Sequence, residues 1–282
     1  MKKFELTTDR IEENGTTLYR IKALIDFGDV KAGDLGGYAE KEENLSQAGN
    51  AWVSDNARVY GDARVYGDAW VYGNARVYGN ARVYGDAEVS GDACVSDNAR
   101  VSGNAWVSDD AYVCDNACVY GNAWVYGNAL VYGDARVSDD AWVYGNVWVY
   151  GNAEVSGDAC VRDNAHVYGD ARVSDDACVY DNAWVYDDAH VYGNAEVSDN
   201  ARVYGNAQVS GNADYIYLKG FGSHNRSTTM FREENGNIYV SCGCFSGTLQ
   251  EFENKVKETH GNSKFAREYL ALVEAAKIHF EV

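Results

Sequence analysis

The stretch Ala63-Arg64-Val65-Tyr66-Gly67-Asp68 is one copy of a six-residue phrase that repeats 27 times between Ala51 and Asn212, without insertion or deletion. Each copy has, as a rule, Ala, a variable residue, Val, then Tyr or Ser, then Gly or Asp, and last Asp or Asn. Self-similarity at a fixed period of six residues is typical of a parallel β-helix, in which each coil stacks on the previous one. The sequence therefore predicts a mainly β protein organised around residues 51–212.

The residue types of the phrase fit a short strand followed by a corner. Val is β-branched and favours strands. Successive strand side chains point to opposite sides, so an inward Val leaves its two neighbours pointing outward. Gly adopts positive φ freely and Asp or Asn tolerate it, so this pair turns the corner, and the small Ala that follows can point inward. An α-helix is excluded because Val would rotate around it and each Gly would cost about 1 kcal/mol.

The pattern resembles the hexapeptide-repeat family of left-handed β-helices, in which a small residue follows an aliphatic one by four positions. Val65 with Ala69 and Val71 with Ala75 fit that pattern. The resemblance implies a left-handed coil with three strands and 18 residues per turn, so the 27 copies would make nine coils. At a strand spacing of about 4.8 Å those coils would be roughly 43 Å long. The family also implies a homotrimer with parallel axes.

Composition and charge restrict the classes of molecule that the protein is expected to bind. The formal net charge of −19 opposes binding to nucleic acid or to an anionic membrane. The N-terminal residues lead into polar sequence rather than the apolar part of a signal peptide, and no apolar run has the length of a membrane span. Seven cysteines without a framework spacing suit a reducing compartment. We expect a cytoplasmic protein with no cofactor, no metal and no membrane or nucleic-acid partner.

Residues 1–50 precede the repeat and are expected to cap its open end. Two strands are predicted around the turn at Asn14-Gly15. The glycine-rich stretch 27–38 reads as a loop and lacks the spacing of a phosphate-binding motif. This N-terminal part resembles uncharacterised bacterial and prophage hexapeptide-repeat proteins, some of which are named transferases on the basis of fold alone.

Phasing the repeat at 18 residues sorts the outward residues before each Val into three columns. Five tryptophans share one column, and an exposed apolar stripe of this kind usually marks an oligomer or partner interface, although stacking alone would also explain it. These tryptophans are Trp52, Trp70, Trp106, Trp124 and Trp142. A second column is rich in Arg, including Arg64, Arg82 and Arg100, and predicts surface ion pairs with corner residues such as Asp62 and Asp68.

Two adjacent rungs of the Trp column carry Cys160 and Cys178, which we expect to be free thiols. Acyltransferases of the hexapeptide family usually have a catalytic His and a loop that interrupts the coils. Residues 51–212 contain no interruption, and His166 and His190 fall in different outward columns. We therefore predict no catalytic residue. The alternative is an acyl-CoA-dependent acyltransferase whose groove is lined by Trp124, Trp142 and one of these histidines.

Residues 213–282 break the period and predict a small α+β domain. A strand at 215–218 is followed by a hairpin of 227–232 and 238–242 around Asn235-Gly236. Thr248 and Glu251 form a capping box that begins a helix, Gly261 ends it, and a second helix follows to about Phe280. The segment resembles C-terminal domains of phage-encoded proteins of unknown role.

One turn of this domain gathers hydroxyl, imidazole and guanidinium groups that could hold an anion such as phosphate, although the same composition also makes an ordinary loop. The candidate residues are Ser223, His224, Arg226, Thr228 and Thr229. Cys242 and Cys244 lie on one strand without the further ligands that zinc requires, and Cys244 with His260 is a conceivable nucleophilic pair.

These observations predict a non-enzymatic, rigid, oligomeric scaffold that presents its C-terminal domain or an intersubunit groove to a ligand or a protein partner. Resemblance suggests a phage or prophage origin. The alternatives are the acyltransferase and a binder of small phosphorylated or nucleotide-like molecules.

Overall fold

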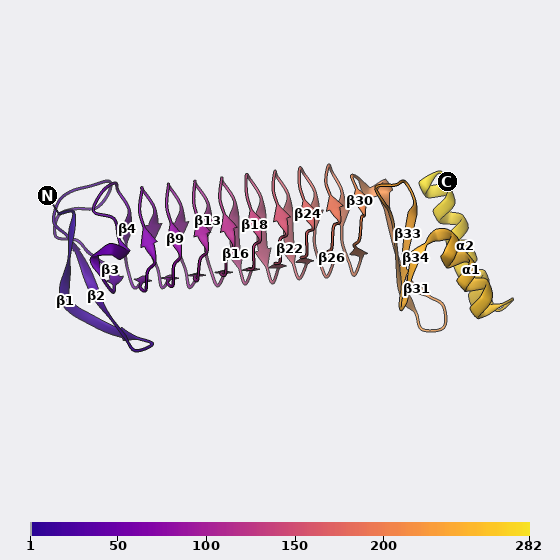
Figure 1. Cartoon of the computed structure of the whole chain (residues 1–282), viewed down its shortest axis with the longest axis horizontal. Helices are drawn as coiled ribbons and strands as arrows, with labels where there is room; N and C mark the ends of the chain where they lie inside the picture. Colours follow the sequence, from indigo (N-terminus) through magenta and orange to yellow (C-terminus); the bar gives the residue numbers. More distant parts are fainter. Residues whose placement is uncertain (1) are drawn as a thin grey trace. The chain divides into compact units, whose positions relative to one another are not determined.

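The computed structural model describes residues 2–282. They form two compact units that are consecutive in the sequence and join between Asn152 and Ala153. Both units contain parallel strands that pair with the strand 18 residues further on, and the second unit also contains an antiparallel sheet with two helices (Figure 1). The predicted parallel β-solenoid with a small α+β C-terminal domain is confirmed.

The first unit begins with an antiparallel hairpin. Strand β1 (Phe4–Glu13) pairs with β2 (Thr16–Ala23), as predicted, around Asn14 and Gly15, whose φ angles are 50° and 82°. Positive φ at both central residues gives the turn the twist that suits a two-residue hairpin. The hairpin supplies Phe4, Leu18 and Ile21 to the buried interior of this unit.

Part of the predicted loop 27–38 is a strand, which corrects the sequence interpretation. Strand β3 (Leu35–Ala39) pairs antiparallel with β2 and parallel with β5 (Arg58–Val59). A Cβ on Gly36 would collide with the side chain of Ile21, so this glycine is needed for close packing rather than for a loop. A short 3-10 turn, η1 (Glu42–Asn44), follows β3, and Leu45 bridges to Val65. Parallel pairing to the solenoid thus begins before residue 51.

The repeat strands of the first unit fall into three parallel sheets. The first sheet contains β4 (Trp52–Val53), β7 (Trp70–Val71), β10 (Glu88–Val89), β13 (Trp106–Val107), β16 (Trp124–Gly127) and β19 (Trp142–Gly145). The second continues from β5 through β8 (Arg76–Val77), β11 (Cys94–Val95), β14 (Tyr112–Val113), β17 (Leu130–Val131) and β20 (Trp148–Val149). The third contains β6 (Arg64–Val65), β9 (Arg82–Val83), β12 (Arg100–Val101), β15 (Cys118–Val119) and β18 (Arg136–Val137).

Val and Ala fill the interior of these coils, as the pattern predicts. Val53, Val101 and Ala129, for example, have no exposed surface. The strand pairs place Val directly on Val of the next coil, as in the pairing of Val65 with Val83. The backbone of each rung donates to the next, for example from Arg64 N to Ala81 O at 2.9 Å. Each coil therefore buries its apolar side chains only by stacking on its neighbours.

Corner residues adopt the positive φ that the sequence anticipates. Gly103 has a φ of 71° and Asp97 one of 58°. The spacing between successive corners is also tight, because a Cβ on Gly103 would lie 2.8 Å from the carbonyl oxygen of Gly121. Glycine at such a corner therefore relieves both a backbone strain and a contact with the next coil.

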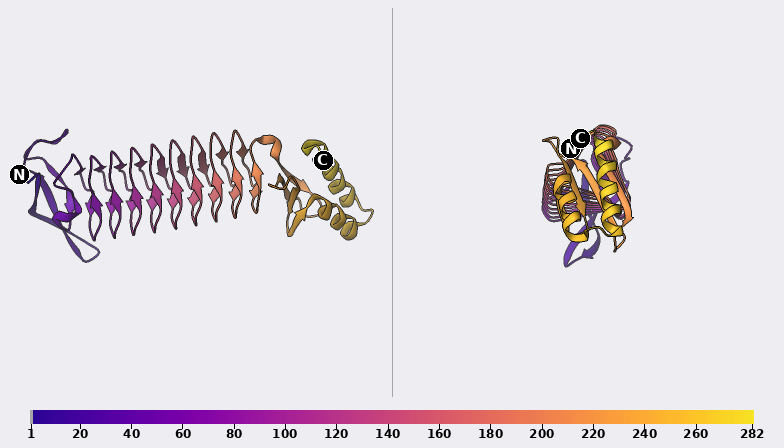
Figure 2. Two further views of the ribbon diagram at one scale, coloured as in Figure 1. Left: turned by 45° about the horizontal axis from the view of Figure 1, so that its top comes forward. Right: turned by 90° about the vertical axis from the view of Figure 1, so that its right-hand side faces the viewer.

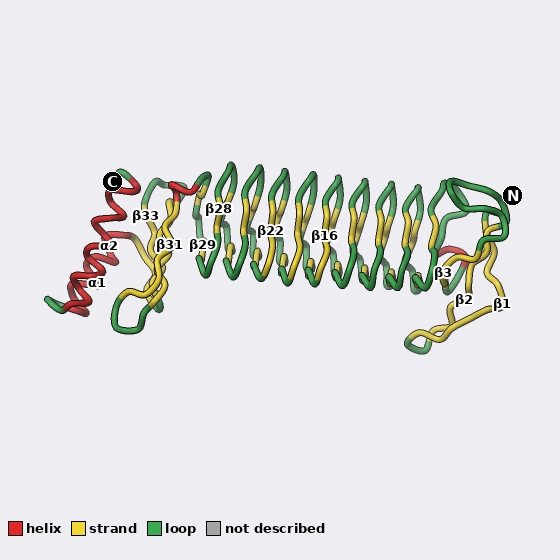
Figure 3. Tube along the Cα trace, turned by 180° about the vertical axis from the view of Figure 1, so that it is seen from behind, coloured by secondary structure: helices red, strands yellow, loops and turns green. Residues whose placement is uncertain are grey.

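The second unit, seen from behind in Figure 3, begins with coils of the same kind. The strands that continue the Trp column are β22 (Cys160–Asp163), β25 (Cys178–Val179) and β28 (Glu196–Val197). The next column contains β23 (His166–Val167), β26 (Trp184–Val185) and β29 (Arg202–Val203). The last column contains β21 (Glu154–Val155), β24 (Arg172–Val173), β27 (His190–Val191) and β30 (Gln208–Val209).

A four-stranded antiparallel sheet follows the 3-10 turn η2 (Asn212–Asp214). Its strands, in spatial order, are β31 (Tyr215–Phe221), β32 (Arg226–Arg232), β33 (Ile238–Cys242) and β34 (Phe245–Thr248). The predicted hairpin around Asn235-Gly236 is confirmed, whereas β34 was not anticipated. The sheet meets the last coil through β32, because Glu233 bridges to Ala207 and the hydroxyl of Thr229 accepts a hydrogen bond from the Arg202 N–H.

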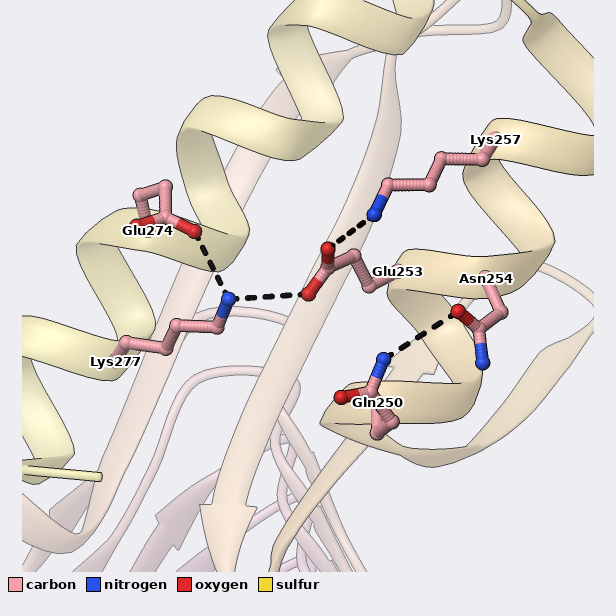
Figure 4. A network of polar contacts seen from close by, with 6 residues as sticks. All are labelled: Gln250, Glu253, Asn254, Lys257, Glu274 and Lys277. Carbon is pink, nitrogen blue, oxygen red and sulfur yellow. Dashed lines mark hydrogen bonds and ion pairs between the residues drawn. The ribbon is translucent and has the colours of Figure 1, made fainter.

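Helices α1 (Leu249–His260) and α2 (Lys264–Phe280) lie side by side against one face of this sheet (Figure 2). The predicted capping box is present, since Thr248 accepts from the Glu251 N–H and Glu251 accepts from the Thr248 N–H. Glu253 on α1 accepts hydrogen bonds from Lys257 and from Lys277 on α2, which joins the two helices (Figure 4). Among the described residues, no helix has the length and apolar character needed to cross a membrane.

Candidate anion-binding site

A cavity of about 610 Å³ lies within the second unit, between the last coils and the outer face of the C-terminal sheet. Trp184 and Arg202 line it from the coils, and Lys219, Arg226 and Thr229 line it from the sheet. Ser227, Ser241 and two asparagine side chains complete a polar wall. The cavity therefore offers several hydrogen-bond donors and three cationic groups to one small molecule.

Strand alternation explains which side chains reach this cavity. Arg202 is the outward residue before the buried Val203, in the same position of the phrase as Trp184 one coil earlier. On β32, Ser227 and Thr229 face the cavity, while Thr228 between them points to the opposite side, toward the helices. The side chains of the site thus come from two secondary-structure patterns that both alternate with a period of two.

Aromatic contacts order one wall of the cavity. The guanidinium of Arg202 lies 5.6 Å from the ring centroid of Trp184, and the other side of this ring stacks on His166 at 4.6 Å. A cation over an indole face is attracted by the ring quadrupole. The contact holds Arg202 in place while leaving its N–H groups able to bind an anion.

The three cations of the cavity lack carboxylate partners. Within residues 2–282, no ion pair within 4.0 Å involves Arg202, Lys219 or Arg226, and none of the ten lining residues is acidic. The chain as a whole carries a net charge of −19, so positive charges gathered without acids are against its composition. Like charges held together without counter-charges repel one another, and a bound anion would remove that cost.

The sequence analysis named five candidate ligand-binding residues in the turn near Arg226, and the C-terminal sheet places them on its two sides. Arg226 and Thr229 line the anion cavity, and Ser223 and His224 line a second cavity near the helices, which Arg226 also borders. Thr228 belongs to neither, because it is fully buried and donates a hydrogen bond from its hydroxyl to the Cys242 Sγ at 3.1 Å. Thr228 is therefore a core residue of the domain.

Sequence reasoning missed Trp184, Arg202 and Lys219 as partners of Arg226. Arg202 lies 24 positions before Arg226, in a column of mixed residues that also contains Arg58 and Arg76, so no local signal set it apart. One usable signal was that Arg202 belongs to the last coil of its column, next to the point where the period ends. A side chain on the last coil can contact the domain that follows the repeat.

The Trp column is only partly exposed, which corrects one residue of the predicted interface. Trp52 is only 3% exposed because Phe27 of the N-terminal segment packs against it at 5.4 Å, so it cannot contribute to a surface. Trp106, Trp124 and Trp142 form a continuous ladder, with ring centroids 4.4 and 5.3 Å apart, and Trp142 is 43% exposed. Glu88 separates Trp70 from this ladder.

Among the described residues, no ion pair within 4.0 Å involves Arg64, Arg82 or Arg100, although Arg172 of the same column pairs with Glu154 at 3.7 Å and the charge of Arg64 acts on Asp62. Asp62 instead pairs with Lys41 at 2.7 Å. The contact with Lys41 also lowers the pKa of Asp62. The cap competes for the corner carboxylate because Lys41 is a long side chain directly beside it.

The acyltransferase alternative requires one of the two histidines, His166 or His190. His166 on β23 and His190 on β27 belong to different sheets. Burial against Trp184 lowers the pKa of His166, which keeps the imidazole neutral near neutral pH. A neutral imidazole that stacks on a neighbouring ring, as His166 does on Trp184, is typical of a residue that serves packing.

The cysteines are all free thiols in the described residues, as expected for Cys160 and Cys178, which pair on adjacent rungs. One unpredicted cluster brings Cys114 within 4.8 Å of Asp97 and Asp115. Burial, with the two carboxylates adding to it, raises the pKa of Cys114 to about 12.

Comparison with known proteins finds a repeat model that matches parts of the chain. The YdcK β-solenoid repeat matches at residues 51–67, 57–73, 69–85, 75–91, 93–109, 111–127, 123–139, 129–145, 135–151 and 195–211. These stretches are similar to β-solenoid repeats of the YdcK type. The matches fall in both units and leave residues 1–50 and the C-terminal domain outside the repeat.

One relative carries an activity in its name. The uncharacterised acetyltransferase YdcK of Escherichia coli strain K12 is 38% identical to this chain over 63 residues, which are 20% of this chain and 19% of the relative. The match thus spans about a fifth of that protein. It supports the shared solenoid repeat.

Proposed function

We propose that the protein is a β-solenoid that carries, at its C-terminal domain, a binding site for a small anionic molecule such as a phosphorylated metabolite. The observation that supports this most directly is the meeting of Arg202, Lys219 and Arg226 around one cavity without a carboxylate partner. Guanidinium groups bind phosphate and carboxylate oxygens in pairs of parallel hydrogen bonds, and an ammonium adds a point charge. The cavity volume of about 610 Å³ suits a ligand of metabolite size.

The solenoid serves this function as a rigid support. Arg202 is fixed by the backbone of β29 and by its contact with Trp184, so the coil holds one wall of the cavity in position. The sheet holds the other wall through Lys219 and Arg226. A preorganised site loses less conformational entropy on binding than a mobile one.

The test is calorimetric titration of the whole protein with pyrophosphate and with a nucleoside triphosphate at low ionic strength. We expect saturable binding that weakens with added salt, because charge attraction is screened. Lys219→Ala is the informative variant, since this exposed side chain has no partner within residues 2–282 and its removal leaves the fold intact. A charge-assisted hydrogen bond contributes about 1.5–3 kcal/mol, so we expect affinity to fall by roughly 10- to 100-fold.

Arg82→Ala is the matched control, because Arg82 is an exposed outward residue of the same phrase outside the cavity. It should bind the probes as the unmodified protein does. Absence of binding to both probes, or equal losses in the Lys219 and Arg82 variants, would contradict the proposal.

The relative's name favours a second candidate, an acetyltransferase that uses an acyl-CoA donor. Acetyl-CoA is itself a phosphorylated anion, so it belongs among the ligands to titrate. Release of free coenzyme A in the presence of amine or hydroxyl acceptors would support this candidate. Binding of acetyl-CoA without turnover would leave the protein a binding module.

A further inference from the structure

A second cavity, of about 390 Å³, lies on the helix side of the C-terminal sheet. Phe245, Phe252 and Val256 give it an apolar wall. Cys244 faces it from the turn between β33 and β34, and His260 faces it from the end of α1. The cavity therefore combines room for an apolar group with a thiol at its edge, and the anion site described above does not use either.

The thiol of Cys244 is placed against a guanidinium. Arg226 Nη1 lies 3.7 Å from the Cys244 Sγ and donates to it. Gly243 has a φ of 64°, so glycine suits the tight Cys242-Gly243-Cys244 turn, and the guanidinium of Arg226 lies against this glycine. The turn thus places Cys244 beside Arg226.

The charge of Arg226 makes Cys244 unlike the buried thiols of the chain. Its hydrogen bond and positive charge lower the pKa of Cys244, and the side chain is exposed. Burial raises the pKa of Cys94 and Cys178 instead. Cys242, two residues away, is only 4% exposed and accepts from Thr228. Because the thiolate is the nucleophilic form, Cys244 is the thiol prepared to react.

We propose that Cys244 accepts an acyl group from a small-molecule thioester whose acyl chain lies in this second cavity. The thiolate of Cys244 attacks the thioester carbonyl carbon and forms a new carbon–sulfur bond. The tetrahedral intermediate then expels the thiol of the donor as a thiolate, which takes a proton from water. The product is an acyl thioester on Cys244, and the exchange of one thioester for another needs no oxidant or reductant.

Each part of the surroundings has a role in this exchange. Arg226 stabilises the thiolate before attack. Phe245, Phe252 and Val256 bury the acyl chain, at about 0.8 kcal/mol per methylene removed from water. The step thus favours acyl chains of several carbons over acetyl.

The proposal is tested by incubating the full-length protein with acetyl and hexanoyl thioesters of N-acetylcysteamine and measuring intact mass, followed by peptide mapping. We expect a single acyl group on Cys244, added faster from the hexanoyl donor. Cys244→Ser should abolish the addition, and Cys242→Ser should retain it. Arg226→Gln should slow it about tenfold, as expected when the thiolate loses its positive neighbour.

A steric variant separates the cavity from mere thiol reactivity. Thr259→Trp places a bulky ring at the mouth of the cavity from an exposed position of α1. It should suppress transfer from the hexanoyl donor while leaving alkylation of Cys244 by iodoacetamide unchanged. Equal transfer from both donors, an unaffected Thr259 variant, or acyl groups spread over Cys118 and Cys160 would overturn the proposal. Lys219→Ala should not affect acylation, so failure here is distinguishable from failure of the anion site.

Discussion

The repeats of residues 51–152 and the C-terminal domain satisfy their side chains in opposite ways. In the repeats many side chains bond to the equivalent residue one coil away, as when Asn80 donates to Asn98 at 3.1 Å and Asn98 donates to Asn116 at 3.1 Å. Tyr66 and Tyr84 stack likewise at 4.9 Å. In the C-terminal domain contacts are made once, and Lys219 has no side-chain partner within residues 2–282. Repetition therefore stabilises the coils, whereas the aperiodic domain leaves the Lys219 side chain without a protein partner among the described residues.

The substitution with the largest expected effect on stability tests whether the coils are stabilised by their buried interior alone. Val101→Asp would place a carboxylate at a position with no exposed surface, paired in register with Val83. Burying an unpaired carboxyl should destabilise the protein by about 4 kcal/mol or more. Urea unfolding followed by circular dichroism measures the loss.

The control is Arg100→Asp, one residue earlier and exposed. It should shift the urea midpoint little, because an outward charge stays in water. Similar losses in the two variants would show that the outward column is as important to stability as the interior, which would break the comparison.

A smaller loss of stability is expected from replacing corner glycines, and two such variants distinguish backbone strain from close contact between neighbouring coils. Gly103→Ala should destabilise by about 2–3 kcal/mol, because it adds a strained positive φ and a contact at 2.8 Å with the Gly121 carbonyl. Gly236 also has a positive φ, of 82°, but no atom lies within 4 Å of a Cβ added there. Gly236→Ala should therefore destabilise the protein by only about 1 kcal/mol. The difference between the two shifts in thermal midpoint measures the destabilisation caused by the contact between neighbouring corners. Equal shifts would argue against close corner spacing.

The same difference explains how much of the fold the sequence could predict. A strand and corner recur every six residues, so each copy repeats the evidence for Val inside and Gly or Asp at the corner. The hairpin at Asn14-Gly15 and the helix start at Thr248 were also predictable, because a turn or cap depends on neighbouring residues. Strand β3 was missed because its pairing depends on distant contacts of Gly36 with Ile21 and Val53.

The candidate sites were predictable only in part for the same reason. Arg226 stood out within its turn, but its neighbours across the cavity, Arg202 and Lys219, are brought to it by the packing of β32 on the last coil. The burial of Trp52 depends on Phe27, 25 residues earlier, so the column pattern alone overstated its exposure. The left-handed coil still rests on the family resemblance.

The Trp ladder gives a prediction about assembly. We propose that Trp106, Trp124 and Trp142 mark the surface where copies of the chain meet in a homotrimer. Trp124→Ala should cost about 1–2 kcal/mol through lost stacking and should also lower the molar mass measured by light scattering to that of a monomer. Tyr66→Ala removes a comparable stack with Tyr84 and should leave the mass unchanged. An equal mass for both variants would make the ladder a stacking feature only.

The smallest expected effect concerns charge pairing in the C-terminal domain, where Glu253 contacts Lys257 and Lys277 (Figure 4). These contacts lower the pKa of Glu253 in the folded protein, so its contribution to stability is present above the unfolded pKa of about 4.3 and is lost as the pH falls through the folded pKa. Glu253→Gln should therefore cost about 0.5 kcal/mol near neutral pH and progressively less as the pH falls through the folded pKa. A series of urea midpoints from neutral to acidic pH measures this, with Glu258→Gln as the control, since its carboxylate is 71% exposed and should matter less. A pH-independent loss on replacing Glu253 would mean that its hydrogen-bond geometry, rather than its charge, joins the two helices.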